Sequence, residues 1–192
     1  MPDDSAPINL TNHFLIAMPG LDDAAFSRSV VYVCEHSERG ALGLVINKPS
    51  DINLKGLFDK VQLPLGRDDL QQLPVFQGGP VQTDRGFVLH RREKRWHWQS
   101  TLHVTAQISL TTSRDILESI AHDDGPQEAL IALGYAGWGP GQLEEELAAN
   151  AWLSLPAEPS ILFEVPLEQR AQAAAARLGI NLGLLSSTFG NA

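Results

Sequence analysis

The sequence predicts an α+β fold, formed as a single domain around a mostly antiparallel sheet. Strand-like segments dominate the first half of the 192 residues, whereas helices alternate with strands in the second half. That order is typical of α+β proteins and differs from the regular alternation of a doubly wound parallel sheet. The length also favours one domain, at about 150 residues per domain. We assign residues 1–10 to a loose N-terminal leader and residues 11–192 to the domain.

The strands expected in the first half are short and end at glycine, proline or polar residues. Ser29–His36 is apolar on both faces, which is typical of a central strand. The short loop Ser37–Gly40 joins it to Leu42–Asn47 and therefore predicts a β-hairpin. Before this hairpin, Asp22–Asp23 are expected to cap a brief helical turn. The other expected strands are His13–Met18, Val75–Phe76, Gly86–Arg92 and Leu102–Leu110.

Capping residues mark two predicted helices. Asn53 is expected to cap a short helix that ends at Val61. Thr112 with Asp115 resembles a capping box, with the shorter acid in place of glutamate, and predicts a helix that ends before Gly125.

The second half alternates strands and helices. Ala129–Tyr135 is predicted to be a buried strand, followed by a glycine-rich turn at Gly137–Gly141 and a helix. Ser160–Val165 is predicted to be a late strand, and Pro166 suits the first turn of a last helix. The residues expected to face inward on these two helices are Leu143, Leu147 and Ala151 on the first, and Leu167, Ala171, Ala174, Ala175 and Leu178 on the second.

Charge and cysteine content exclude several classes of function. The chain has 14 basic and 23 acidic residues, a net charge of −9, which disfavours general nucleic-acid binding. The single cysteine excludes a disulfide within the chain and zinc sites with several cysteine ligands. The acidic start of the chain does not resemble an export signal, and no apolar segment has the ~20 residues that span a bilayer. We therefore expect a cytoplasmic protein without membrane contact.

The glycine-rich turn at Gly137–Gly141 precedes a helix, where backbone amides can attract an anion. Its glycine spacing fits neither a P-loop nor a dinucleotide-binding fingerprint. Glu144, Glu145 and Glu146 follow directly, and their charge outweighs the half positive charge of a helix N-terminus. We interpret the segment as a structural turn.

A few histidines and one cysteine are the candidates for chemistry. Cys34 and His36 lie two apart on a predicted strand, so they are expected to share a face. With His13 or His90 nearby they would form a metal site or a Cys/His nucleophile pair. The simpler interpretation is a buried cysteine beside a hydrogen-bonded histidine. The predicted ligand pocket consists of His13, Cys34, His36, His90, Trp138 and Gln142, and no metal or cofactor is predicted.

One basic and aromatic cluster follows the strand that ends near His90. Positive charge beside aromatic rings is what binds single-stranded nucleic acid. The same composition is typical of a solvated hairpin tip, so both interpretations stay open. The candidate anion contacts in this cluster are Arg91, Arg92, Lys94 and Arg95, which precede Trp96 and Trp98.

Several segments together, in their order along the chain, resemble the YqgE/AlgH family of bacterial proteins. Each segment alone is weak, but the ordered set is specific and runs from about residue 11 to residue 178. Two positions depart from the family, which often has Trp where this chain has Ala171 and His where it has Asn191. The segments are His13–Leu21, Val30–His36, Gly40–Pro49, Gly78–Val81, Arg85–His90, Thr111–Leu117, Leu133–Glu144 and Asn150–Leu153.

The resemblance implies a bent, bifurcated sheet that closes toward a pseudo-barrel, with helices packed outside it, in a bacterial cytosolic protein. It implies no catalytic residues. Some members of the family are labelled transcriptional regulators, but this sequence contains no helix-turn-helix pattern and no basic recognition helix.

Three functions remain as hypotheses. The first is a non-enzymatic protein that binds a protein partner or a small ligand. The second is a transcription-related regulator that contacts nucleic acid through Arg91–Trp98, and the third is an enzyme that uses a His/Cys cleft.

Overall fold

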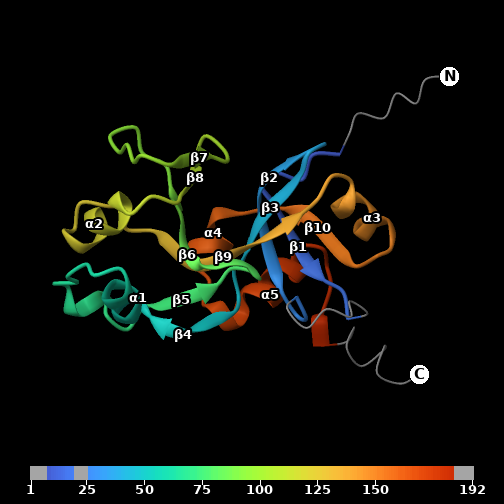
Figure 1. Cartoon of the computed structure of the whole chain (residues 1–192). Coiled ribbons are helices and arrows are strands. Elements are labelled where there is room, and N and C mark those ends of the chain that lie inside the picture. Colours follow the sequence, from blue (N-terminus) through green and yellow to red (C-terminus); the bar gives the residue numbers. More distant parts are fainter. Residues whose placement is uncertain (1–7, 20–25, 184–192) are drawn as a thin grey trace.

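The sheet curls into a half-barrel, with helices on both of its faces (Figure 1). The computed structural model describes residues 8–19 and 26–183. Within these residues, the strand order is β10-β1-β2-β3-β9-β6-β8-β7, and β4 and β5 join it through β9. The strands are β1 (His13–Ala17), β2 (Val30–Ser37), β3 (Gly40–Val45), β4 (Pro49–Asn53), β5 (Pro74–Gln77), β6 (Val81–Arg91), β7 (Thr101–His103), β8 (Ile108–Thr111), β9 (Ala129–Trp138) and β10 (Trp152–Pro156).

Five α-helices and one 3₁₀ turn are formed by the described residues. Together with the sheet they confirm the predicted α+β class and the bent, mostly antiparallel sheet; among the described strands, β5 and β9 form the one parallel pair. The helices are α1 (Leu54–Lys60), α2 (Asp115–Ala121), α3 (Gln142–Ala148), α4 (Pro159–Phe163) and α5 (Leu167–Ala176), and the 3₁₀ turn is η1 (Asp68–Leu70).

The sheet branches at β9. One edge of β9 pairs with β6, whereas its other edge pairs first with β5 at Ala132 and Leu133 and then with β3. Gly134 lies between these two pairings, in a left-handed conformation with φ of 76°. A Cβ atom on Gly134 would lie 2.4 Å from the carbonyl oxygen of Gly79, so the branch needs glycine for its backbone angle and for the close approach of the β5–β6 connection.

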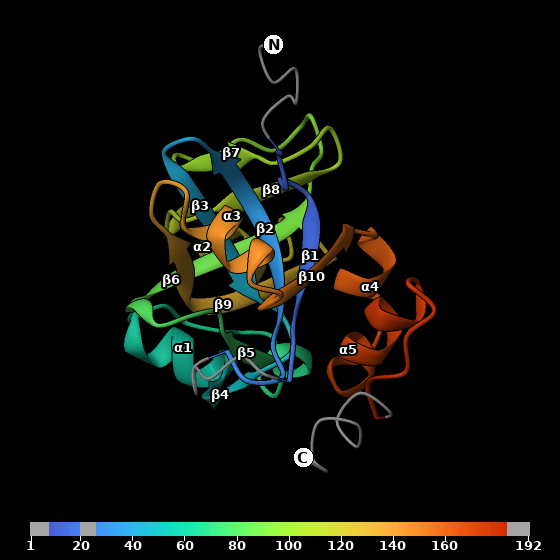
Figure 2. The ribbon, with the colours of Figure 1, turned by 90° about the vertical axis from the view of Figure 1, so that its right-hand side faces the viewer.

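Three apolar cores result from this arrangement. The interior core lies inside the curl, between the strands and α4 and α5. A second core lies beneath α3 on the outer face of β1–β3 and β10, and Figure 2 shows α3 in front of β2 and β3. A third core lies between the sheet and the helices α1 and α2. The representative residues are Tyr32 and Leu89 for the interior core, Leu143 and Trp138 for the second, and Leu57 and Ile116 for the third.

Most strands of the first half agree with the sequence prediction. The hairpin of β2 and β3 is confirmed, and the backbone of Gly40 lies so close to Trp138 that a Cβ there would be 2.2 Å from the Trp138 carbonyl oxygen. Asn53 caps α1 as predicted, because its side chain accepts a hydrogen bond from the Gly56 amide. The turn predicted at Asp22–Asp23 lies outside the described residues.

Three predicted elements are wrong. The strand predicted at Leu102–Leu110 is a hairpin of β7 and β8, because the Thr105 hydroxyl accepts from the amides of Gln107 and Ile108 and closes a turn. The capping box is also wrong, because Arg114 occupies the N-cap of α2 without a side-chain bond. Ser160–Val165 is mostly helix α4 rather than a strand.

The C-terminal part also differs in detail. β10 was not predicted, and it pairs with β1 from the far end of the chain. In α5, Ala174 and Ala175 are buried as expected, but Leu178 is 42% exposed beyond the end of the helix. Of the predicted leader, residues 1–7 lie outside the described residues, whereas Leu10 is buried in the second core. None of the described helices is long and apolar enough to span a membrane.

Candidate functional site

Three of the predicted pocket residues lie around α3, and each is engaged in holding that helix. The Nδ1 atom of His36 accepts a hydrogen bond from the Leu10 amide at 2.9 Å, so Nε2 carries the proton and donates to Glu144. Trp138 donates from its indole to Glu146 at 2.9 Å, and the Gln142 side chain accepts from the Gly139 amide. These bonds fasten α3 and its glycine turn to the sheet.

Cys34 lies on the other side of the sheet from His36, so the prediction that they share a face is wrong. A β-bulge between Val33 and Glu35 inserts Cys34 as an extra residue and changes the alternation of β2. Cys34 is 1% exposed in the interior core, and burial raises the pKa of its thiol far above its ordinary value, with a smaller contribution from the charge of Glu35. A protonated, buried thiol is a poor nucleophile.

His90 is buried on β6, away from α3. Its Nε2 lies 2.8 Å from the Thr111 hydroxyl, and its Nδ1 donates to the carbonyl oxygen of Arg91 at 2.9 Å. The edge of its ring packs against Trp98, and burial lowers the pKa of the imidazole. His13, on β1, has its Nδ1 3.2 Å from the carbonyl oxygen of Thr11.

The six predicted pocket residues therefore divide among separate places in the fold. His36, Trp138 and Gln142 meet at α3, Cys34 lies inside the curl, and His90 lies beneath Trp98. Among the described residues, no group of three or more His, Cys, Asp or Glu side chains is arranged to hold a metal ion.

The basic cluster after β6 is partly neutralised by glutamates. Arg91 forms an ion pair with Glu128, and Arg95 forms one with Glu93 at 2.8 Å. The Arg95 guanidinium also lies 4.6 Å from the centre of the Trp96 ring. The remaining two basic residues, Arg92 and Lys94, are exposed.

A different site lies between α1 and α2, where no sequence motif indicated one. The two helices cover the outer face of β6 and β9, and two hollows of about 350 and 410 Å³ open between them. Ile131 of β9 lines both hollows. We call this feature the α1/α2 cleft, with a first hollow on the side of η1 and a second on the side of β6.

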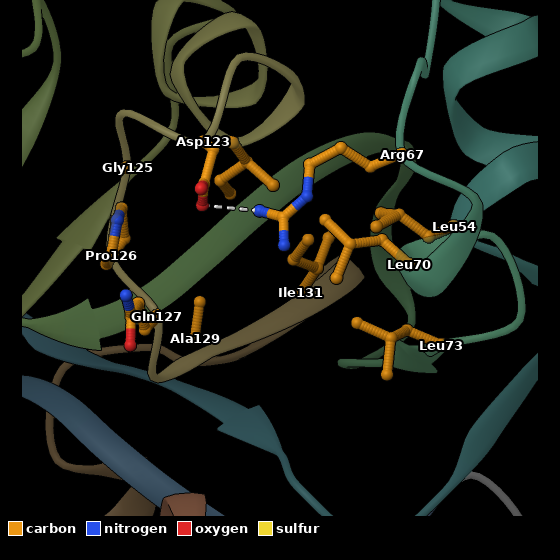
Figure 3. A pocket seen from close by; sticks show the side chains of 11 residues that line it. Leu54, Arg67, Leu70, Leu73, Asp123, Gly125, Pro126, Gln127, Ala129 and Ile131 are labelled. Atoms are coloured by element: carbon orange, nitrogen blue, oxygen red, sulfur yellow. Dashed lines mark hydrogen bonds and ion pairs between the residues drawn. The ribbon is translucent and has the colours of Figure 1, made fainter.

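Arg67 crosses the mouth of the first hollow (Figure 3). Its guanidinium binds Asp69 and Asp123, each at 2.7 Å, and so connects the η1 segment to the end of α2. Both acidic partners are largely exposed, so the bridges add little stability. The apolar residues that line this hollow are Leu54, Leu70, Leu73, Ile120 and Ile131.

The basic residues of the second hollow are less neutralised by carboxylates than Arg67 is in the first. Arg85 donates to the side-chain oxygens of Gln82 and Thr112, both at 3.3 Å, and neither oxygen is charged. The acid nearest to Arg114 is Glu118, at 3.7 Å. Lys60 completes a basic rim around an apolar floor. The floor residues are Leu57, Val61, Val88, Leu117 and Ile131.

Sequence reasoning missed this cleft because its residues come from separate segments. Lys60, Arg85 and Arg114 are far apart in the sequence, each directly beside an aspartate, and they lie on α1, β6 and the start of α2. The helix-capping Asn53 and the apolar spacing of α2 predicted the two helices, but nothing in one sequence predicts that they lie together on β9.

Comparison with known proteins assigns the family. The AlgH-like family model matches residues 14–183. The chain belongs to the AlgH-like family. UPF0301 proteins from Acidovorax sp. and Polaromonas sp. are both 56% identical to it, over the full length of both chains. The resemblance seen in the sequence is thereby confirmed.

Solved structures agree with this AlgH-like assignment. The solution structure of AlgH from Pseudomonas aeruginosa is 51% identical, covers 95% of each chain and gives a TM-score of 0.80. A protein from Corynebacterium diphtheriae has a TM-score of 0.71 at 20% identity and covers 95% of this chain and 94% of its own, which shows the fold alone. These matches establish a family and a fold rather than a reaction.

Proposed function

We propose that this AlgH-like protein is a cytoplasmic binding protein, and that its ligand occupies the α1/α2 cleft. The observation that carries the proposal is the cleft itself, with two hollows over a shared apolar floor and a charged rim. Their volumes lie in the range of roughly 300–1,000 Å³ that is usual for small-molecule sites. An apolar floor with a few polar groups on its rim suits an amphipathic small molecule.

The engagement of the histidines and the cysteine supports binding rather than catalysis. His36 and His90 use both ring nitrogens in hydrogen bonds within the fold, and Cys34 is a buried thiol with a raised pKa. A His/Cys enzyme would need these groups free and within reach of one substrate. This alternative therefore ranks below ligand binding.

A transcription-related regulator that contacts nucleic acid through Arg91–Trp98 is the second alternative. The ion pairs of Arg91 with Glu128 and of Arg95 with Glu93 remove half of the positive charge that this function would use. The net charge of −9 adds long-range repulsion from a phosphate backbone. We therefore rank it below ligand binding as well.

The proposal is tested by mapping a fragment library onto the ¹⁵N-labelled protein by NMR. The library contains acidic, basic and neutral fragments. We expect the shifted backbone amides to concentrate on α1, α2 and the part of β9 around Ile131. Shifts that concentrate around α3 or on Arg91–Trp98, or a library without any hit in the cleft, would reject the proposal.

Two matched variants sharpen the mapping. Leu73 is 46% exposed and lines the first hollow, whereas Ile8 is 61% exposed and lies outside the cleft. Leu73→Lys is expected to weaken fragments that bind in the first hollow, while Ile8→Lys leaves them unchanged. Equal effects of both variants would show that those fragments bind elsewhere.

A further inference from the structure

We propose that the second hollow of the α1/α2 cleft is an anion site, which takes a small molecule with a carboxylate or phosphate group on an apolar body. This inference rests on the proposed function and names the chemical class of its ligand. It is carried by three basic residues that different elements bring to one rim, and by an open space in the floor beneath them.

The charge of the rim is the first argument. Lys60, Arg85 and Arg114 line the hollow, and Asp84 is the one acidic residue among its lining residues. Glu118 is not a lining residue but lies 3.7 Å from Arg114, so at least one positive charge remains in excess in a chain whose net charge is −9. Among the described residues, Lys60 and Arg85 have no carboxylate within 4 Å, in contrast to Arg67 in the first hollow. A local excess of positive charge in an acidic protein attracts an anion to this place.

The present hydrogen bonds of the two arginines are the second argument. Arg85 donates to Gln82 and Thr112 at 3.3 Å, and Arg114 donates to the carbonyl oxygen of Gln62 at 3.4 Å. These bonds are long and their acceptors are neutral, so they are weaker than the paired, charge-assisted bonds of a guanidinium with a carboxylate or phosphate. The Arg85 guanidinium also lies 5.8 Å from the centre of the Phe87 ring, and Arg114 has Glu118 at 3.7 Å. These weak contacts orient the two guanidinium groups while leaving them able to exchange partners for an anion.

Gly86 is the third argument, because it leaves the floor of the hollow open. It lies in β6, where successive side chains face opposite sides of the sheet. Phe87 and Leu89 face the interior core, so Gly86 faces the other side, together with Val88 of the third core. A Cβ atom built on Gly86 would have no atom within 4 Å. Its φ is not in the left-handed region, so the backbone does not require glycine here.

Glycine inside a strand weakens the strand, and it often marks a place where a ligand approaches closely. At Gly86 the missing side chain adds space beside the apolar floor formed by Leu57, Val88 and Ile131. The hollow of about 410 Å³ therefore combines room for an apolar body with basic groups for an anionic head.

The test is isothermal titration with three probes that separate charge from apolar contact. Octanoate carries a carboxylate, phenyl phosphate carries a phosphate, and octanol has the apolar chain without charge. We expect octanoate or phenyl phosphate to bind at least ten times more tightly than octanol, with an affinity that falls as salt is raised.

Variants assign the binding to the second hollow. Arg85→Gln combined with Arg114→Gln is expected to weaken the anionic probe at least ten-fold. Lys55→Gln is the matched control, because Lys55 lies on α1 but pairs with Asp59. Gly86→Val is expected to weaken binding of the probe by placing a side chain in the hollow, while circular dichroism shows an unchanged fold.

The outcomes separate the two proposals. If octanol binds as tightly as octanoate, or if the double arginine variant binds the anions unchanged, the anion site is rejected while the binding cleft stands. If no fragment and no probe reaches the cleft, both proposals are rejected.

Discussion

His90 is a buried polar side chain with a partner at each ring nitrogen, and it shows how burial affects a titrating group. Both of its ring nitrogens are engaged, by the Thr111 hydroxyl and by the carbonyl oxygen of Arg91. Thr101 adds its hydroxyl to that of Thr111 at 2.9 Å and extends the network across β8 and β7. The imidazole is therefore satisfied in its neutral form, and it is burial that disfavours the charged form.

Acidification is expected to destabilise the protein through His90. Burial lowers the pKa of His90 in the folded state, so below pH ~6.5 the unfolded chain binds the proton more readily than the folded one. The free energy of unfolding should fall as the pH drops from 7.5 to 5. Urea denaturation at several pH values measures this loss, and His90→Gln should show a smaller loss than the wild type. Identical pH profiles for the two proteins would contradict the role assigned to His90.

Arg170 is a second buried polar group with an architectural role. It is 8% exposed on α5, donates from Nε to the Val165 carbonyl oxygen at 3.1 Å and from Nη1 to that of Ile46, and stacks on Phe76. We expect Arg170→Lys to lower the free energy of unfolding by about 2–3 kcal/mol, because one ammonium group cannot replace the planar fork.

Arg177→Lys is the matched control for Arg170. Arg177 ends the same helix, is about half exposed and pairs with Glu158 on the surface. Its replacement should change stability by less than about 0.5 kcal/mol. Equal losses for the two variants, measured by urea denaturation, would show that the buried hydrogen bonds of Arg170 contribute nothing particular.

At the scale of elements, the branch of the sheet at β9 decides where the α1/α2 cleft lies. β9 connects the half of the sheet that carries α3 with the half that carries α1 and α2. Two glycines in this region differ in whether the fold requires them. Gly134 is required by its backbone and its close neighbours, whereas Gly86 has open space where a side chain would be.

Replacing each of these glycines by alanine should have opposite effects on stability. Gly134→Ala places a Cβ 2.4 Å from the Gly79 carbonyl oxygen at a positive φ, so we expect a loss of about 3 kcal/mol or more. Gly86→Ala meets no atom, so it should stabilise the protein by about 0.5–1 kcal/mol. Thermal or urea unfolding of both variants checks the two signs. A loss at Gly86 as large as that at Gly134 would show that Gly86 is needed by the fold.

Local signals in the sequence predicted most of these elements but not how they assemble. The hairpin of β2 and β3 follows from its glycine turn, and α1 follows from its Asn53 cap. The strand predicted at Ser160–Val165 was wrong because a short apolar segment fits a strand or a buried helix equally well. β10 was missed because its partner, β1, lies more than a hundred residues earlier.

The candidate site was missed for the same reason, because local signals do not show how distant segments pack together. The family and the half-barrel were predicted, since ordered motifs survive in a single sequence. The face predicted for Cys34 was wrong because the alternation of apolar and polar residues does not reveal a β-bulge. The three basic residues of the second hollow come from three segments, and only the packed fold brings them together.

At the scale of the whole molecule, several of the exposed basic side chains are paired with carboxylates. Arg91 and Arg95 are paired with glutamates, and Arg67 is paired with two aspartates. The rim of the second hollow keeps more of its positive charge. A compact anion interacts mainly with this rim, whereas a long polyanion would also be repelled by the net charge of −9.

Nucleic acid is accordingly expected to bind weakly and without a defined site. At 0.15 M salt we expect a single-stranded or double-stranded 30-mer to bind with a Kd weaker than roughly 10⁻⁴ M, the weak end of non-specific binding. Replacing Arg91, Arg92, Lys94 and Arg95 together by alanine should leave that value nearly unchanged, as measured by fluorescence anisotropy over a salt series. A micromolar or tighter Kd with a steep salt slope that this variant abolishes would move the functional site from the α1/α2 cleft to the basic cluster after β6.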